Sequence, residues 1–337
     1  RDFTINAMAY SRRTGIVDQF AGMEDLKNRI IRCVGNPEDR FEEDALRMLR
    51  AVRFSAQLGF SIEEDTRRAI RKMAPRLNMI SSERIRTELD KLLCSPHPEY
   101  FREVYELGIS AVVMPEFDRA MKTPQRNRYH DLTVGEHTLK TMAHIRPDPI
   151  LRWTMLLHDV GKPEARVEGK EKDHFKMHPV IGEKIAEKVL RRLKFDNQTL
   201  RQVKTLVLWH DRRFGGVKEI NIRTVRRWVS EIGPEMFEKL MKIQKADISA
   251  QSDYQREEKE AILSGTKQLF AKILEEQNCL SVKQLAVGGT DLIEAGVPQG
   301  KEVGEMLHWL LDQVLEKPSL NTKETLMDLV KEKRGNI

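Results

Sequence analysis

The sequence has few aromatic residues and no long apolar run. Aromatic side chains make up 6% of the 337 residues, whereas charged side chains make up 33%. This balance favours many amphipathic helices over a β-sandwich. No stretch has the length and apolar character of a membrane span, and the amino-terminal residues lack a signal-peptide pattern. We therefore predict a cytoplasmic protein with no membrane partner.

Cysteine is also scarce, which excludes two classes of small protein. Cys33, Cys94 and Cys279 are odd in number and far apart in the chain. They form neither a disulfide framework nor a Cys-x-x-Cys metal motif. A reducing compartment is consistent with this usage, and the fold has to be held together by hydrophobic cores instead.

Length and charge indicate a multidomain protein with a polyanionic partner. A chain of 337 residues is long enough for two or three domains. The net charge is +6, and residues 1–130 hold 19 Arg against 4 Lys. Guanidinium groups can grip phosphates through two hydrogen bonds, which ammonium groups cannot do. A basic balance alone does not separate a nucleic-acid-binding protein from other soluble proteins.

The apolar pattern predicts a mostly α-helical, multidomain bundle with a short mixed segment at the start. From Pro37 the pattern is helical, and Gly59 is its predicted end. Two more helices follow, with serine caps predicted at Ser61 and at residues 81–82. Further helices are predicted over 136–250, in a charged segment over 251–276, and near the end of the chain over 301–315 and 321–330.

Histidine and aspartate residues in the middle third have the character of metal ligands. His158 and Asp159 are adjacent and follow the apolar run 150–157, which would carry them into a core where an unpaired carboxylate is costly. Other candidates are spread over the neighbouring predicted helices: His137, His178, His210 and Asp247. Each histidine alone is more simply explained as a core or surface residue, but the set favours a metal site within a helical bundle.

The order of these residues, with Gly-Lys after the His-Asp pair, resembles the HD superfamily of metal-dependent phosphohydrolases. The resemblance implies that His137, His158, Asp159 and Asp247 bind a first metal ion. It also implies that His178 and His210 complete a second metal site or contact phosphate, and that Lys162 meets a phosphate oxygen as a catalytic residue. Nitrogen and oxygen ligands admit Mn, Fe, Co, Ni, Zn or Mg, so the metal is a divalent ion of unknown identity.

Three motifs in the first hundred residues carry a sharper resemblance. RDFTINAMAY, FEEDALRMLRAVRF and SSERIRTELDKLL occur in the order found in class II tRNA nucleotidyltransferases and bacterial poly(A) polymerases. In that family, Asp44 and Arg47 would form a protein template for the base edge of CTP or ATP. A carboxylate accepts from the exocyclic amine that both bases carry, and a guanidinium donates to ring nitrogen or oxygen. In isolation, the two residues could instead be an ordinary surface ion pair.

The same resemblance assigns supporting roles to other residues. Arg1 and Asp2 would belong to a hinge near the triphosphate, and Asn6 would support that loop. Arg50 and Arg53 would contact nucleotide further along the helix that carries Arg47, and Glu83, Arg84 and Arg86 would brace a neighbouring helix. The implied function is CCA addition to tRNA 3′ ends from CTP and ATP.

One part of the family pattern has no counterpart here. Family members hold Mg²⁺ with paired carboxylates upstream of the RDFT segment, and no Asp-x-Asp pair occurs anywhere in these residues. Because the chain opens directly on RDFTINA, we expect it to be cut from a longer protein. We expect these residues alone to recognise bases and RNA without transferring nucleotides.

These expectations divide the chain into four parts. Residues 1–35 would be a remnant of a nucleotidyltransferase head, 36–128 a neck with the template residues, 129–255 an HD metal-binding domain, and 256–337 a tRNA-binding tail. Three alternatives stay open: a poly(A) polymerase, a free-standing HD phosphohydrolase, and a tRNA-binding module without catalysis. A homodimer is compatible with the sequence.

Overall fold

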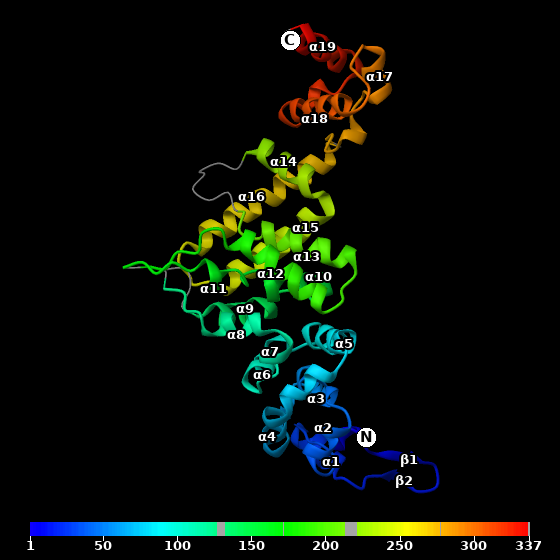
Figure 1. The fold of residues 1–337 in the computed structure, drawn as a ribbon, viewed down its shortest axis with the longest axis vertical. Helices are drawn as coiled ribbons and strands as arrows, with labels where there is room; N and C mark the ends of the chain where they lie inside the picture. The colour runs from blue at the N-terminus through cyan, green and yellow to red at the C-terminus, as the bar shows by residue number, and fades with distance from the viewer. Residues whose placement is uncertain (127–131, 171, 213–220, 277, 336–337) are drawn as a thin grey trace. The chain divides into compact units, whose positions relative to one another are not determined.

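The computed structural model describes residues 1–337 except 127–131, 171, 213–220, 277 and 336–337. The fold is mostly α-helical, as predicted (Figure 1). The chain divides into two compact units, of which the first comprises Arg1–Arg212 with Lys242–Arg256 and the second Arg213–Met241 with Glu257–Ile337. The first two predicted domains lie in the first unit, whereas residues 213–241 of the predicted HD domain fall in the second, and the division into four domains stays a prediction. The predicted boundary at 128/129 lies outside the described residues.

The first unit begins with short strands and one helix. Strands β1 (Ala9–Ser11) and β2 (Gly15–Val17) form an antiparallel hairpin, and β3 (Ile30–Ile31) pairs in parallel with β4 (Ser61–Ile62). Helix α1 (Gly22–Asn28) lies between the two pairs in sequence. Phe3 is fully buried and its backbone bridges to Cys33, which ties the start of the chain to the helical core.

The neck helices confirm part of the sequence prediction and correct another part. Instead of one helix from Pro37 to Gly59, there are two helices, α2 (Pro37–Glu43) and α3 (Leu46–Leu58), separated by an extended Asp44. Gly59 ends α3 as predicted, because it takes a positive φ of 68° that a residue with a Cβ rarely adopts. The other helices of this part are α4 (Glu64–Met73), α5 (Ser82–Leu93), α6 (Phe101–Glu106), α7 (Ser110–Val113) and α8 (Pro115–Lys122).

Helices α3 and α5 pack through apolar faces and one buried ion pair. Leu49 and Val52 of α3 and Leu89 of α5 are fully buried. Between these helices, Arg53 Nε lies 3.1 Å from Glu88 Oε2, and only 8% and 5% of the two side chains are exposed. Burial lowers the pKa of Arg53, and the negative charge of Glu88 opposes that shift. Arg53 therefore braces the neck and is not available at the surface.

Replacing Arg53 is expected to destabilise the neck strongly. Arg53→Met would leave the Glu88 carboxylate buried without its partner, which costs about 3–5 kcal/mol in comparable buried pairs. Chemical denaturation should show this fall in the free energy of unfolding. Arg68→Met is the matched control, because Arg68 pairs with Asp65 on the exposed face of α4. Equal stability of the two variants would contradict the brace assignment.

The rest of the first unit is a bundle of helices around the predicted metal ligands. Its helices are α9 (Val134–Ala143), α10 (Pro149–Leu157), α11 (Lys162–Ala165), α12 (His178–Arg192), α13 (Asn197–Trp209) and the end of α15 (Pro234–Ala250). Helix α12 packs along α13, and α10 packs against both α9 and α13. Trp153 of α10 is fully buried and donates from Nε1 to Asp90 of α5 at 2.6 Å, which joins this bundle to the neck.

The second unit contains the start of α15 and the remaining helices. These are α14 (Ile222–Ile232), α16 (Arg256–Glu275), α17 (Gly289–Glu294), α18 (Lys301–Glu316) and α19 (Lys323–Gly335). Helices α18 and α19 confirm the two predicted carboxy-terminal helices. Phe237 packs on Phe270 with ring centroids 5.0 Å apart, so α16 is half buried rather than wholly solvated. In the part of the chain that the structure describes, no helix combines the length and apolar character needed to span a membrane.

Candidate functional site

Asp44 occupies the break between α2 and α3. Its backbone is extended (φ −155°, ψ 105°), and its Oδ1 accepts from the Leu46 N–H at 3.1 Å, so the side chain caps the start of α3. Its Oδ2 accepts from Arg84 Nη2 of α5 at 2.7 Å. Both oxygens therefore have a fixed partner, while lone pairs remain to accept from a ligand.

Arg47, in the first turn of α3, is held by a different set of groups. Its Nε lies 3.0 Å from Asp2 Oδ1, and its Nη1 lies 2.5 Å from Glu43 Oε2. The same Nη1 donates to the Arg40 carbonyl at 3.0 Å. Asp44 and Arg47 are thus near neighbours with separate partners, and the simple i,i+3 ion pair between them is not the arrangement observed.

The other predicted nucleotide-binding residues are divided between the same region and the core. Asp2 also accepts from Arg50 Nε at 2.6 Å, so one carboxylate holds two arginines of α3. Asn6 Oδ1 accepts from the Phe3 N–H at 3.2 Å and Arg1 is exposed, and the roles predicted for both residues stay predictions. Arg53 is the exception, because its guanidinium is buried against Glu88.

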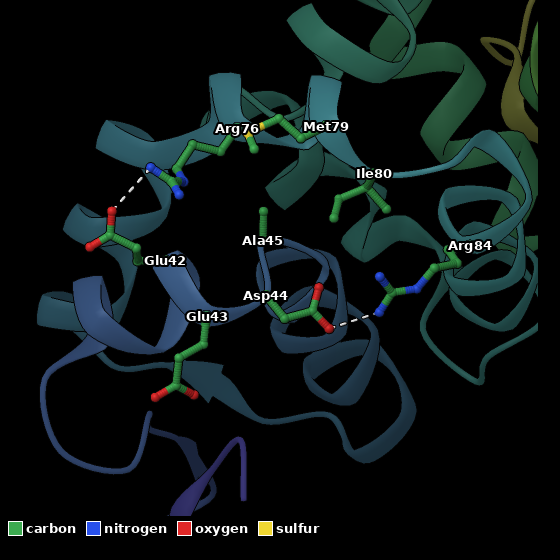
Figure 2. Close-up of a pocket in the computed structure, with 8 residues that line it drawn as sticks. All are labelled: Glu42, Glu43, Asp44, Ala45, Arg76, Met79, Ile80 and Arg84. Atoms are coloured by element: carbon green, nitrogen blue, oxygen red, sulfur yellow. Dashed lines mark hydrogen bonds and ion pairs between the residues drawn. The ribbon is translucent and has the colours of Figure 1, made fainter.

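A pocket of about 350 Å³ opens beside Asp44 (Figure 2). One side is formed by Glu42, Glu43, Asp44 and Ala45, and the other by Arg76, Met79, Ile80 and Arg84. Figure 2 shows Asp44 joined to Arg84 at one end of the pocket and Glu42 joined to Arg76 at another. The pocket therefore combines hydrogen-bonding groups with an apolar surface, which suits a flat heterocycle with polar edges.

The six predicted metal ligands converge inside the bundle of the first unit and are all buried. His137, His158 and Asp247 offer ligand atoms that lie within 4.8 Å of one another, and Asp159, His178 and His210 form a second such group. We call these six residues the HD cluster. They come from α9, α15, the ends of α10 and α13, and the start of α12.

Backbone carbonyls fix the tautomer of three histidines in the HD cluster. Nδ1 lies 2.7 Å from the Met155 carbonyl in His158, 2.8 Å from the Phe175 carbonyl in His178, and 2.7 Å from the Val207 carbonyl in His210. A carbonyl only accepts, so each Nδ1 donates its hydrogen. Nε2 is left with its lone pair directed into the cluster, as in histidines that bind metal.

Asp159 lies between the two groups of ligands. Its Oδ2 is 3.2 Å from His158 Nε2, and its Oδ1 is 3.5 Å from His178 Nε2 and 3.4 Å from His210 Nε2. Burial alone would raise the pKa of Asp159, but the charges of His158 and Lys162 hold it well below its ordinary value. The carboxylate is therefore ionised and can bridge two cations.

The electrostatics of the HD cluster fit a bound cation. Burial by itself would lower the pKa of His158, but the negative charge of Asp159 raises it above its ordinary value. A positive charge between these two side chains is therefore favoured. Burial lowers the pKa of His178 to about 4, which keeps that imidazole neutral and able to bind metal. His158 Nε2 is also buried without a hydrogen-bond partner of good geometry.

The phosphate contact predicted for Lys162 stays a prediction. Its ammonium is buried and points inward, 2.7 Å from Asp159 Oδ2 and 2.7 Å from Gln125 Oε1. A buried ammonium needs such acceptors to offset its lost hydration. In this arrangement Lys162 neutralises Asp159, and these two acceptors occupy two of the three N–H donors of its ammonium.

Three family models match successive parts of the chain. Residues 1–32 match the poly(A) polymerase head domain, residues 59–121 an RNA- and SrmB-binding site of polymerase A, and residues 175–330 the second domain of a tRNA nucleotidyltransferase. All three models describe tRNA nucleotidyltransferases or poly(A) polymerases, so the chain is similar to members of that family along most of its length. The predicted head remnant at residues 1–35 stays a prediction.

Individual relatives agree with this similarity. An A-adding tRNA nucleotidyltransferase of Deinococcus radiodurans is 36% identical over 223 residues, or 62% of this chain and 51% of the relative. The chain thus spans about half the length of that curated relative. The Bacillus stearothermophilus CCA-adding enzyme in complex with CTP matches with a TM-score of 0.71 and 27% identity, over 100% of this chain and 73% of that one.

A more distant solved structure supports the fold alone. The Thermotoga maritima CCA-adding enzyme complexed with tRNA_CCA matches with a TM-score of 0.50 and 19% identity, over 99% of this chain and 72% of that one.

Sequence reasoning missed several contacts that hold side chains of the two candidate sites. Glu88 joins α5 to α3, and the contact between Arg84 and Asp44 joins α5 to the break between α2 and α3. Gln251 donates to Asp247 Oδ2 at 3.0 Å, one helical turn along α15. The spacing of Asp247 and Gln251, four residues apart, could have indicated this contact. No local sequence pattern predicts a contact between residues 40 positions apart, such as Asp44 and Arg84.

Proposed function

We propose that this chain is the base-selecting and RNA-binding part of a tRNA nucleotidyltransferase that adds C, C and A to tRNA 3′ ends. Its substrates would be tRNA, CTP and ATP. The observation that carries the proposal is the position of Asp44, a carboxylate held at the edge of a pocket with both oxygens oriented. An acceptor of this kind favours bases with an exocyclic amine, which cytosine and adenine share at the recognised edge.

The chain's own residues have separate tasks in this proposal. Asp44 accepts from the base amine, and Arg47 donates to ring nitrogen or oxygen after exchanging its contact with Glu43. Asp2 holds Arg47 and Arg50 near the expected triphosphate. Transfer would use Mg²⁺, but outside the HD cluster the described residues contain no group of three close metal-binding side chains.

Binding of the four nucleoside triphosphates tests this proposal. We expect the full chain, in the presence of tRNA lacking its CCA end, to bind CTP and ATP more tightly than UTP and GTP. Equilibrium dialysis with labelled nucleotides measures the four dissociation constants. Tight binding of ATP alone would favour an A-adding or poly(A)-adding enzyme, and equal binding of all four would contradict base selection by Asp44.

A second candidate activity is hydrolysis of phosphate esters at the HD cluster. The specific observation is the pair of three-residue groups joined by Asp159. Divalent metal held there would supply Lewis-acid chemistry for attack on phosphorus. His137, His158 and Asp247 would hold one ion, His178 and His210 a second, and Asp159 would touch both. Hydrolysis of a phosphomonoester or cyclic phosphate that is lost in His158→Ala but retained in Asp44→Asn would support it.

Two further partners are proposed, tRNA at the tail and a second copy of the chain. The tail over residues 256–337 is proposed to bind tRNA, and α18 and α19 give it a folded core around Leu310 and Val330. Such binding should weaken steeply with salt if it rests on phosphate contacts. A homodimer stays a prediction, to be checked by measuring the mass of the protein in solution.

A further inference from the structure

The pocket beside Asp44 contains a guanidinium other than that of Arg47. Arg84 lines the pocket and lies 2.7 Å from Asp44 Oδ2 (Figure 2). Arg47 is absent from the lining and pairs with Asp2 and Glu43. The carboxylate that is proposed to select the base is therefore held, on its pocket side, by a residue of α5. This contact joins segments that are 40 residues apart in the chain.

The contact with Arg84 stops a rotation of the Asp44 carboxylate that its contact with the Leu46 N–H leaves possible. Leu46 N–H holds only Oδ1 of Asp44, so without Arg84 the carboxylate could rotate about its own C–C bond and expose Oδ2 to other donors. With Arg84 in place, the plane of the carboxylate is fixed by one donor on each oxygen. Each oxygen keeps a lone pair, which a base in the pocket can reach because Asp44 lines it.

We propose that Arg84 is a positioning residue that sets the orientation of Asp44 and thereby enforces selection of amino over keto bases. The inference rests on the proposed function and deepens it. Cytosine presents an amine where uracil presents a carbonyl oxygen, and an oriented carboxylate accepts from the first and repels the second. When the carboxylate can turn away, the repulsion of uracil weakens and the two bases become more alike.

A purely structural role for Arg84 predicts something different. The side chain of Arg84 is 51% exposed, and an exposed ion pair between α5 and the α2–α3 break contributes little to stability. An ion pair that only holds α5 to the α2–α3 break would leave the ratio of CTP to UTP affinity unchanged. The ratio therefore separates a positioning role from a structural one, which stability alone does not.

The test compares dissociation constants of CTP and UTP for the full chain and for Arg84→Met, with thermal unfolding measured on the same samples. We expect the preference for CTP to fall by about tenfold in Arg84→Met, the scale of one well-placed hydrogen-bonded contact to a base. Arg84→Lys should restore part of the preference, because one donor to Oδ2 remains. Arg68→Met is the matched control, and its CTP-to-UTP ratio should equal that of the wild type.

Each other outcome has a defined meaning. An unchanged ratio in a folded Arg84→Met variant would overturn the positioning role while the proposed function stands. An equal loss of CTP and UTP binding would also overturn it, because Arg84 would then serve affinity rather than selection. A wild-type chain that binds CTP and UTP equally would overturn both proposals. If Arg84→Met does not fold, Arg84→Lys with an unchanged ratio at reduced affinity would overturn the positioning role.

Discussion

Asp159→Asn is expected to abolish metal uptake by the HD cluster. Asp159 is 2% exposed and is the only one of the six residues whose two oxygens face both groups of ligands. The substitution keeps the shape of the side chain and removes its charge. Loss of a single orienting partner costs a metal site about 10–100-fold in affinity, and loss of the bridging ligand itself should cost at least about 100-fold.

The same variant should also lose stability, for a reason independent of metal. The buried ammonium of Lys162 would keep only the neutral Gln125 as an acceptor. Removing one partner of a buried charge pair costs about 3–5 kcal/mol. We therefore expect a lower unfolding temperature in chelator as well as in metal.

Elemental analysis of the purified protein, repeated after dialysis against a chelator and reloading, measures the first effect. His144→Ala is the matched control, because His144 lies at the exposed end of α9, the helix that carries His137. The control should retain the metal content of the wild type. Unchanged metal content in Asp159→Asn would show that the HD cluster is not a metal site.

Asp44→Asn is expected to weaken CTP and ATP binding by about 10–100-fold, the range that corresponds to 1–3 kcal/mol per specific base contact. The amide offers one oxygen instead of two and places a donor where the base amine also donates. It also loses the charge that holds Arg84. UTP binding should change least, because the new amide donor can meet the uracil carbonyl.

Asp65→Asn provides the comparison for Asp44→Asn. Asp65 lies in the first turn of α4 and pairs with Arg68 at the surface, so its loss should leave all four affinities unchanged. If Asp44→Asn binds CTP and UTP with wild-type affinities, Asp44 does not recognise the base. That result would also contradict the proposal that Arg84 positions Asp44 for base selection.

The HD cluster could be predicted as a set because its residue types carry the chemistry. An adjacent His-Asp pair after an apolar run favours a buried cation, because an unpaired carboxylate in a core is costly, and the neighbouring predicted helices were expected to bring the other candidates close. Lys162 was less predictable. Whether its ammonium faces inward or outward depends on Gln125, a residue 37 positions away that supplies the second acceptor.

The neck shows where local sequence patterns fail. A continuous apolar pattern from Pro37 to Gly59 concealed the break at Asp44, although aspartate is a favoured helix cap and could have indicated it. One of the two predicted serine caps is confirmed and the other is wrong. Ser81 caps α5 as predicted, but α4 is capped by Glu63 and not by Ser61. Arg53 was assigned to nucleotide because the helical period gave no sign that Glu88 would face it across the α3–α5 contact.

The most direct test of the central claim offers the full chain a tRNA lacking its CCA end, with Mg²⁺ and labelled CTP and ATP, and reads binding and incorporation together. The account predicts tRNA binding that weakens with salt, together with bound CTP and ATP and no extension of the tRNA, because these residues contain no Asp-x-Asp pair. Absence of both tRNA and nucleotide binding would contradict the account. Extension of the tRNA would show that these residues contain carboxylates able to support transfer, which the account does not predict.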